Sequence, residues 1–142
     1  MSDSRVLAER FNRQIRDIVL MLRRANAAQS ITTQQMLVMG SLEHGPRRMT
    51  DLAIEHGVRL PTMTRQIGRL ARDGLVARRR DFEDARVIIV ELTPAGRARL
   101  SRGREQRINF LAARLEALTD AERASIEAAL PALAKLFADT EP

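Results

Sequence analysis

The sequence has no cysteine and no tyrosine, and its only histidines are His44 and His56. Without cysteine, the chain can form no disulfide framework, no thiolate metal site and no cysteine-based redox sensor. Two histidines near predicted helix ends offer little for a metal site. The sequence also lacks a glycine-rich phosphate loop and a defensible arrangement of Ser, His and Asp. We therefore expect no enzyme activity and no cofactor or metal.

Long apolar runs are also absent. No segment is apolar over enough residues to span a membrane, and residues 1–9 are polar with mixed charge. The sequence shows no internal repeat, low-complexity tract or Gly/Ser linker. A length of 142 residues is most simply one domain with a core of its own. These features predict a cytoplasmic protein that does not bind membranes.

The positive charge is concentrated in one short segment. Residues 59–80 contain seven arginines against one acid, Asp73, and therefore account for a net charge of +6. The rest of the chain has 17 basic and 17 acidic residues and is neutral. A localised cationic segment of this kind indicates a site for a polyanion such as nucleic acid.

This segment overlaps a predicted helix-turn-helix. One short helix is expected to start at Thr50 as its N-cap, with Asp51 in the first turn, and to end at Gly57. About four residues later, a second helix is expected with Pro61 at its first position, ending near Gly74. Two short helices joined by a tight turn that contains glycine are typical of DNA-binding helix-turn-helix proteins.

The second of these helices is amphipathic. At 100° per residue, one face carries Met63, Ile67, Leu70 and Ala71, and the other carries Arg65, Arg69 and Arg72, with Thr62 and Gln66 beside them. An ordinary surface helix with solvated arginines is the common explanation for such a pattern. Two observations count against it: the residue four positions after Arg65 is another arginine and not an acid, and the helix-turn-helix pattern precedes it.

The stretch that follows predicts a β-hairpin. Residues 75–80 and 87–92 have the pattern of two short strands, with residues 81–86 as their connection. A hairpin directly after a recognition helix is a wing. We expect Asp81 or Asp84 to hold its tip by pairing with Arg86 and accepting bonds from loop N–H groups. The alternative is that these acids only balance a basic hairpin.

Further helices are expected on both sides of this region. The first covers residues 6–26 with an apolar stripe that includes Phe11 and Ile15, and the second opens at a capping box at Thr32. Thr93 is expected to cap a long helix, and Thr119 to open a last helix that Pro131 should kink.

A winged module does not need these apolar helices. They predict a dimer interface, with a thicker monomeric bundle as the alternative.

Several motifs, in this order and spacing, resemble the multiple antibiotic resistance regulator (MarR) family of bacterial winged helix-turn-helix proteins. The most specific is the wing signature, Asp-x-Arg followed by an apolar strand and Leu-Thr-x-x-Gly. It is read in "DARVIIVELTPAGRARL", and supporting matches are "TTQQ", "MTDLA", "MTRQIGRLARDGLVAR" and "LTDAE". The resemblance covers nearly the whole chain. The sequence departs from the usual pattern of the family at three positions. Leu60 stands in place of a Ser-type cap, Phe82 in place of a proline, and Ala85 in place of a second arginine. The departures at Phe82 and Ala85 predict a looser wing tip.

The resemblance implies a mainly α fold with a small antiparallel β-hairpin, in which four helices, two strands and two further helices follow one another. Its winged helix-turn-helix region covers residues 32–92, and a helical dimerisation region covers residues 5–28 and 94–139. It also implies a homodimer on a near-palindromic operator in double-stranded DNA, with the fourth helix in the major groove and the wing on the minor groove. Family members often sense lipophilic or phenolic small molecules.

The sequence therefore predicts a sequence-specific DNA-binding transcriptional repressor. The alternative is a protein-interaction module whose basic hairpin meets an acidic partner. The residues expected at DNA are Arg59, Pro61, Thr62, Thr64, Arg65, Arg69, Arg72, Arg78, Arg80, Asp84 and Arg86. A ligand pocket would draw on Phe11, Ile15, Met36, Met39 and Phe110, although each of these is more often plain core.

Overall fold

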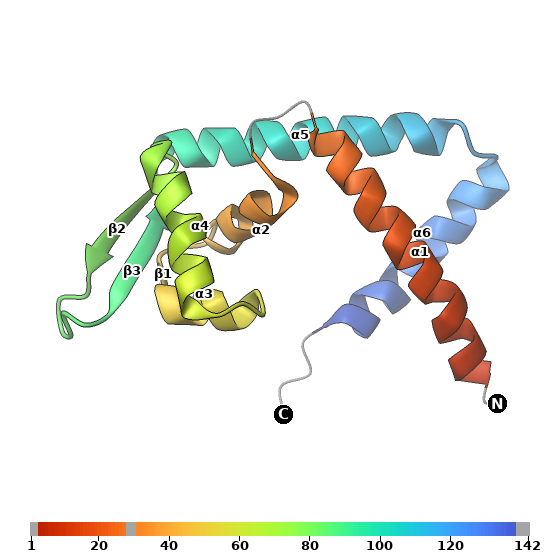
Figure 1. Ribbon diagram of the computed structural model, residues 1–142. Helices are drawn as coiled ribbons and strands as arrows, with labels where there is room; N and C mark the ends of the chain where they lie inside the picture. Colours follow the sequence, from red (N-terminus) through yellow and green to blue (C-terminus); the bar gives the residue numbers. More distant parts are fainter. Residues whose placement is uncertain (1–2, 28–30, 139–142) are drawn as a thin grey trace. The chain divides into compact units, whose positions relative to one another are not determined.

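The computed structural model describes residues 3–27 and 31–138. Its elements are α1 (Asp3–Asn26), α2 (Thr33–Ser41), β1 (Arg47–Arg48), α3 (Met49–Glu55), α4 (Leu60–Arg72), β2 (Val76–Arg80), β3 (Ile88–Leu92), α5 (Pro94–Glu116) and α6 (Asp120–Phe137) (Figure 1). The mainly α class with a small antiparallel sheet is confirmed. The predicted region boundaries at residues 28 and 139 lie outside the described residues.

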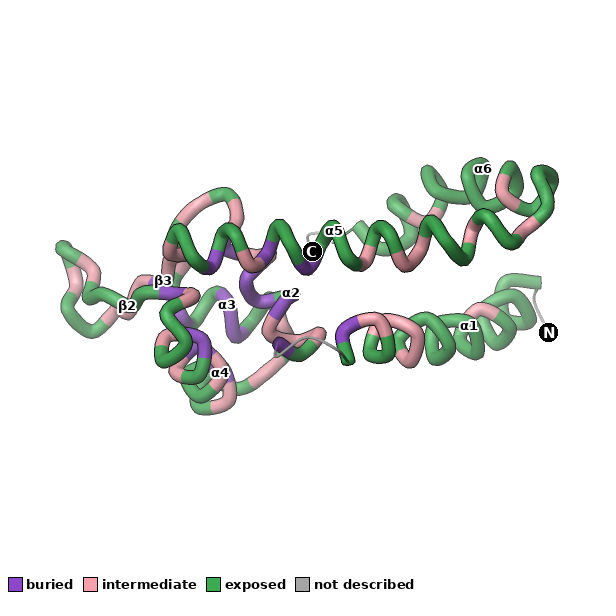
Figure 2. The backbone as a smooth tube through the Cα atoms, turned by 90° about the horizontal axis from the view of Figure 1, so that it is seen from above, coloured by how far each residue is buried: buried purple, intermediate pink, exposed green. Residues whose placement is uncertain are grey.

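The chain divides into two compact units, Met1–Arg107 and Ile108–Pro142. The core of the first unit is formed by side chains from α2, α3, α4 and the sheet, together with Leu100 of α5. Figure 2 shows these buried positions gathered around α2, α3 and α4. Met63, Ile67 and Leu70 on α4 are fully buried, which confirms the predicted apolar face of this helix.

The sheet contains one strand more than the sequence predicts. Its order is β1-β3-β2 and all neighbours are antiparallel, with Arg47 opposite Val90 and Arg78 opposite the same valine on the other side. A strand of two arginines has no alternation of apolar and polar residues, so no local pattern predicts it. β1 exists because β3 offers it a hydrogen-bonding edge.

The position of β1 also corrects the predicted start of α3. Arg48, and not Thr50, is the N-cap, and its side chain makes no capping hydrogen bond. Arg48 is extended because it pairs with Ile89, so the chain turns into the helix directly after the strand and buries Met49 as the first helical residue. Asp51 lies in the first turn, as expected.

The start of α4 is shifted in the same way by one residue. Arg59 is the N-cap, again without a side-chain hydrogen bond, and Leu60 is the first helical residue. Pro61 is therefore the second residue, a position where its missing N–H costs nothing because the first turn has no intrahelical acceptor. Leu60 is not a cap.

The predicted caps at Thr32, Thr93 and Thr119 are confirmed, whereas α1 starts at Asp3, three residues before the predicted start. Thr32 and Gln35 form a reciprocal capping box, with bonds of 3.0 and 3.1 Å, and Thr119 and Glu122 form a second one. The Thr93 hydroxyl accepts a hydrogen bond from the Gly96 N–H at 3.0 Å, so Thr93 caps α5.

In the second unit, α6 follows the Thr119 cap with Pro131 inside it, and the kink expected there stays a prediction. Arg123 donates to the carbonyl oxygens of Leu115 and Leu118 at 3.1 and 2.6 Å, which fixes the turn between the end of α5 and α6. None of the residues described in α6 is buried. Over the described residues, the helices are all too short or too polar to cross a membrane.

Candidate nucleic-acid interface

The helix-turn-helix consists of α3, a turn at residues 56–59, and α4. Gly57 in the turn has a φ of 63°, a conformation that other residues rarely adopt. The Val58 N–H donates to the Ala53 carbonyl oxygen at 3.0 Å, so the turn is closed by a backbone hydrogen bond. These local features hold α4 against α3 and orient its outer face.

The outer face of α4 is exposed and cationic. Arg65, Arg69 and Arg72 are all exposed, and none of them forms an ion pair with an acid of the described residues. The Thr64 hydroxyl on the same helix donates to the Leu60 carbonyl oxygen at 2.9 Å, so its oxygen keeps two lone pairs as acceptors. The face can therefore offer guanidinium donors to an anion or to a base edge.

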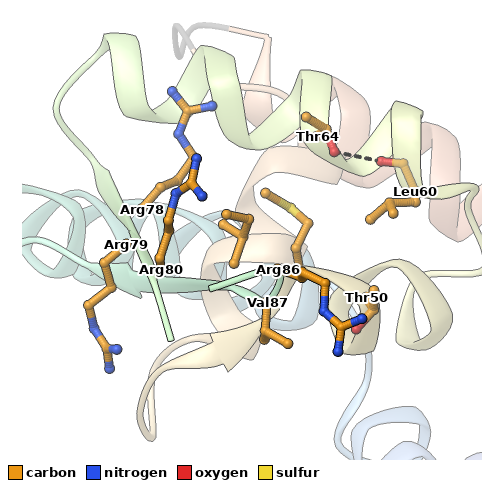
Figure 3. Close-up of a pocket in the computed structure, with 10 residues that line it drawn as sticks. Thr50, Leu60, Thr64, Arg78, Arg79, Arg80, Arg86 and Val87 are labelled. Atoms are coloured by element: carbon orange, nitrogen blue, oxygen red, sulfur yellow. Dashed lines mark hydrogen bonds between the residues drawn. The ribbon is translucent and has the colours of Figure 1, made fainter. Parts of the chain in front are cut away.

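The wing is the antiparallel pair β2–β3 with its connecting loop at residues 81–86. Val76 at the start of β2 is buried, and the following residues of the strand are exposed. Figure 3 shows Arg78 and Arg80 extending toward α4, while Arg79 points away from it. The Arg78 guanidinium lies close to α4. A Cβ added to Gly68 of that helix would be 3.9 Å from Arg78 Nη1.

A groove of about 540 Å³ separates the wing from the first turn of α4 (Figure 3). Its lining combines Met49 and Thr50 of α3, Leu60 and Thr64 of α4, and wing residues 78–80 and 86–88. Four of the residues predicted at DNA line this groove together, namely Thr64, Arg78, Arg80 and Arg86. Thr50 was missed as a member of this groove, because only the packing of β1 on β3 places the start of α3 beside the wing. Leu60, at the start of α4, was missed as well.

Asp84 and Arg86 form a bidentate pair at the wing tip. Arg86 Nε donates to Asp84 Oδ1 at 3.1 Å and Arg86 Nη2 donates to Asp84 Oδ2 at 3.1 Å, and the Arg86 backbone N–H donates to Oδ1 at 3.0 Å. This confirms the expected pairing of Arg86 with a tip acid and identifies that acid as Asp84. The Arg86 side chain is 91% exposed, so the carboxylate orients a guanidinium that still faces solvent.

The electrostatic effect of this pair is mutual. The side-chain hydrogen bonds from Arg86 lower the pKa of Asp84, its backbone N–H lowers it further, and the charge of Arg48 adds a smaller effect. The hydrogen bond from Asp84 raises the pKa of Arg86. Both groups are therefore charged at neutral pH. Arg48 is a further residue that the sequence reasoning missed, since β1 carries it toward the wing.

Arg79 differs from its neighbours in its partners. Its Nε atom lies 4.0 Å from Glu91 Oε1 on β3, and its guanidinium carbon lies 5.7 Å from the ring centroid of Phe82. Phe82 is 95% exposed at the wing tip. The alternation of side chains along β2 separates Arg79 from Arg78 and Arg80 and directs it to the other face of the strand.

The structure places every residue predicted at DNA on α4, at its N-cap or on the wing. All are exposed except Thr62 and Asp84, which are half-buried. Those of α4 and its cap are Arg59, Pro61, Thr62, Thr64, Arg65, Arg69 and Arg72, and those of the wing are Arg78, Arg80, Asp84 and Arg86.

The residues predicted for a ligand pocket have different environments. Met36 and Met39 are buried in the core, Phe11 is half-buried and Ile15 is 38% exposed on α1. Phe110 belongs to the second unit, where the Arg114 guanidinium lies 5.2 Å from its ring centroid. A groove of about 750 Å³ lies at the junction of α1 and α2, lined by residues that include Leu22, Ile31 and Leu37. The pocket stays a prediction.

One cluster contains the residue types of a hydrolase. Ser41 Oγ lies 2.8 Å from His56 Nε2 and donates to Glu55 Oε1 at 3.0 Å, and Glu55 also pairs with Arg47 at 3.0 Å. A catalytic relay needs the acid on the imidazole, whereas the contacts of the described residues put Glu55 on the hydroxyl. The cluster links α2, α3 and β1 as a structural hydrogen-bond network. No group of three His, Asp or Glu residues in the described chain could hold a metal ion.

Residues 31–88 match the model of the MarR family, and this segment covers α2 to the start of β3, which includes the helix-turn-helix and the wing loop. The match includes the motifs at the second, third and fourth helices and the Asp-x-Arg of the wing.

Individual proteins are also similar to this chain. The chain is 39% identical over 74 residues to the HTH-type transcriptional repressor YetL of Bacillus subtilis, a match that spans 52% of this chain and 44% of that protein. RV1404 of Mycobacterium tuberculosis has a TM-score of 0.82 at 24% identity, covering 99% of this chain and 98% of its own. FabT of Streptococcus pneumoniae, solved in complex with DNA, has a TM-score of 0.70 at 19% identity, covering 98% and 100%. The two structures show a shared fold.

Proposed function

We propose that this protein is a sequence-specific, double-stranded DNA-binding transcriptional repressor. In this proposal α4 enters the major groove and the β2–β3 wing lies on the minor groove. The observation that carries it is the exposed row of Arg65, Arg69 and Arg72 on α4, which have no acidic partners in the described chain. The first turn of the same helix shares a groove with the basic wing. Arginines without partners on a helix that fits the major groove are what phosphate and guanine contacts require.

The match of residues 31–88 to the MarR family model and the similarity to individual proteins support this proposal. The YetL repressor shares 39% identity with this chain over 74 residues, and FabT has the same fold in a complex with DNA. The alternative, a protein-interaction module, would need an acidic partner for the same arginines. A helix-turn-helix with a wing gives no specific reason for such a partner, whereas it places cations along a surface that matches a duplex.

We further propose that the protein acts as a homodimer. α1 exposes Leu7, Ile15 and Ile18, which are 63%, 38% and 46% exposed, and α6 exposes Ile126 and Leu130, which are 43% and 54% exposed. Each unit therefore presents apolar side chains that a second copy of the chain could cover. A two-fold dimer would set two α4 helices about 34 Å apart, as a near-palindromic operator requires.

A small lipophilic or phenolic effector is the last part of the proposal. Within the first unit, Phe11 and Ile15 on α1 are the predicted pocket residues that lie outside the buried core, and they would contact the effector, with release of the operator as the result of binding. The groove at the junction of α1 and α2 offers a second apolar surface of adequate size.

The test is selection of DNA fragments from a genomic pool by the purified protein, followed by titration of one selected operator and a random duplex at several salt concentrations. The proposal expects enrichment of near-palindromic sequences and a slope of log affinity against log salt of about −0.9 for each phosphate contact. Sedimentation should give about twice the chain mass of 16.0 kDa. A flat salt response with no enriched sequence would favour the interaction module instead.

A further inference from the structure

We propose that Phe82, at the tip of the wing, is an apolar wedge that enters the minor groove and packs against deoxyribose and base edges. This inference rests on the proposed DNA-binding function and names a residue through which the wing would hold the groove. Apolar side chains that penetrate a minor groove are a known means of widening and bending a duplex.

The first observation is the exposure of the Phe82 side chain. It is 95% exposed, more than any other large hydrophobic side chain in the described chain. The protein contains only four phenylalanines and no tryptophan or tyrosine, so one of its few aromatic rings stands in solvent at the tip of a hairpin. Single exposed apolar residues are common on proteins, and the surroundings of this one must therefore decide its role.

The second observation is that hydrogen bonds hold the loop that carries Phe82, although the sequence predicts a looser wing tip. The Asp81 N–H donates to the Val87 carbonyl oxygen and the Val87 N–H donates to the Asp84 carbonyl oxygen, both at 2.9 Å. The Asp84–Arg86 pair fixes one side of the loop, and the Arg79 guanidinium lies 5.7 Å from the Phe82 ring centroid. A loop that is already ordered loses little conformational entropy when it docks, so the ring is presented ready for contact.

The third observation is the distribution of charge around the ring. Arg78 and Arg80 stand on the adjoining strand and Arg48 on the sheet, and these cations favour the approach of phosphates along the wing. At the tip itself Asp84 pairs with Arg86, while Asp81 and Glu83 on either side of Phe82 form no ion pair among the described residues, so residues 81–86 carry a net charge of −2. In the proposed docking the basic flanks attract the phosphates that form the walls of the groove, and the Phe82 ring meets the sugars of its interior. Charge complementarity on the flanks therefore selects a duplex as the occupant.

The wedge predicts a measurable loss of affinity in Phe82→Ala. Burying an exposed phenylalanine ring in the groove lowers the free energy of binding, and deforming the duplex offsets part of this gain. The net effect of the ring is a binding affinity roughly tenfold higher than that of a protein without it. The matched control is Ile54→Ala, because Ile54 is 79% exposed on α3 of the same unit and lies outside the proposed interface. Titration of the selected operator should show Phe82→Ala weaker by roughly tenfold and Ile54→Ala within twofold of wild type. Equal affinity of Phe82→Ala and wild type would overturn the wedge.

A second variant allows the environment of the side chain at position 82 to be measured by fluorescence. Because the natural chain has no tryptophan, Phe82→Trp introduces a single fluorophore at the wing tip, and Ile54→Trp does the same on α3. Adding the operator should quench the emission of Phe82→Trp and protect it from acrylamide, while Ile54→Trp stays accessible. Vesicles of phosphatidylglycerol, added without DNA, should change neither emission. Protection by vesicles but not by the duplex would overturn the proposal in favour of a membrane contact.

These measurements separate the wedge from the function on which it rests. Selection of an operator by the wild-type protein tests the DNA-binding function and does not depend on Phe82. If the operator is selected and Phe82→Ala binds it as wild type does, only the wedge fails. If the wild-type protein selects no DNA, the proposed function fails and the wedge fails with it.

Discussion

Leu75 and Gly96 are in such close contact that a Cβ added to Gly96 would lie 1.9 Å from the Leu75 carbonyl oxygen. The same carbonyl accepts a hydrogen bond from the Thr93 N–H at 3.2 Å, and the Thr93 hydroxyl donates to the Gly74 carbonyl oxygen at 2.6 Å. The turn after α4 is therefore joined to the start of α5 by backbone contact. The glycine of the Leu-Thr-x-x-Gly motif is required by this packing.

We expect Gly96→Ala to destabilise the first unit by about 3 kcal/mol, because the methyl group would meet backbone atoms that cannot move aside without breaking these bonds. The matched control is Gly40→Ala in α2, where the structure shows no described heavy atom within 4 Å of the added Cβ. That variant should be stabilised by about 0.5 to 1 kcal/mol, since alanine favours a helix over glycine. Urea denaturation at one protein concentration measures both. A neutral Gly96→Ala would mean that this contact opens in solution.

Arg69→Ala is expected to weaken binding to the selected operator more than binding to random duplex. The difference should be about 1 to 3 kcal/mol if the guanidinium contacts a base edge, because only base contacts distinguish sequences. Arg102→Ala, an exposed arginine on α5, serves as the control and should leave the ratio of the two affinities unchanged. Titration of both duplexes at one salt concentration gives the ratio. An equal loss on both duplexes would assign Arg69 to the phosphates.

Arg86→Ala should lose affinity mainly where the flanks of the operator are rich in A·T pairs, because a narrow minor groove has the deeper negative potential. Asp84→Ala should give a weaker version of the same loss, since it removes the carboxylate that orients Arg86 and keeps the cation. The measurement is a titration of both variants on the operator and on a version with exchanged flanks. Wild-type affinity of Arg86→Ala on every duplex would leave the hairpin without contact to DNA.

The Asp84–Arg86 pair also predicts a titration result. The pKa of Asp84 in the folded protein is lowered from its ordinary 3.8, so the pair is fully formed above pH 3.8 and is lost as the pH falls through the depressed pKa. In Arg86→Ala this pKa should rise but stay below 3.8, because the backbone N–H of residue 86 still donates to the carboxylate. Arg48→Ala should raise it less. Carbon-13 NMR of the Asp84 carboxyl group measures each value, and a wild-type value at or above 3.8 would contradict the pair.

Most helices of this protein are predictable because their signals are local. The capping boxes at Thr32 and Thr119 join residues three apart, and the apolar face of α4 follows from a repeat of 3.6 residues. The pairing of Asp84 with Arg86 is equally local, since the two residues are two apart on one loop. For such features the residues that make the contact are also neighbours in the chain, so the sequence by itself determines them.

Other features depend on residues that are distant in the chain and were decided only by the tertiary structure. β1 forms because β3 supplies an edge more than forty residues later, and this pairing makes Arg48 the N-cap of α3 and brings Thr50 to the groove beside the wing. The contact of Gly96 with Leu75 likewise needs α5 to pack on the turn after α4. Hydrogen bonds and contacts between distant segments outweigh the local preference for Thr50 as a helix cap. With Arg48 as the cap, Met49 becomes part of the helix and is buried, whereas a Thr50 cap would leave Met49 outside the helix.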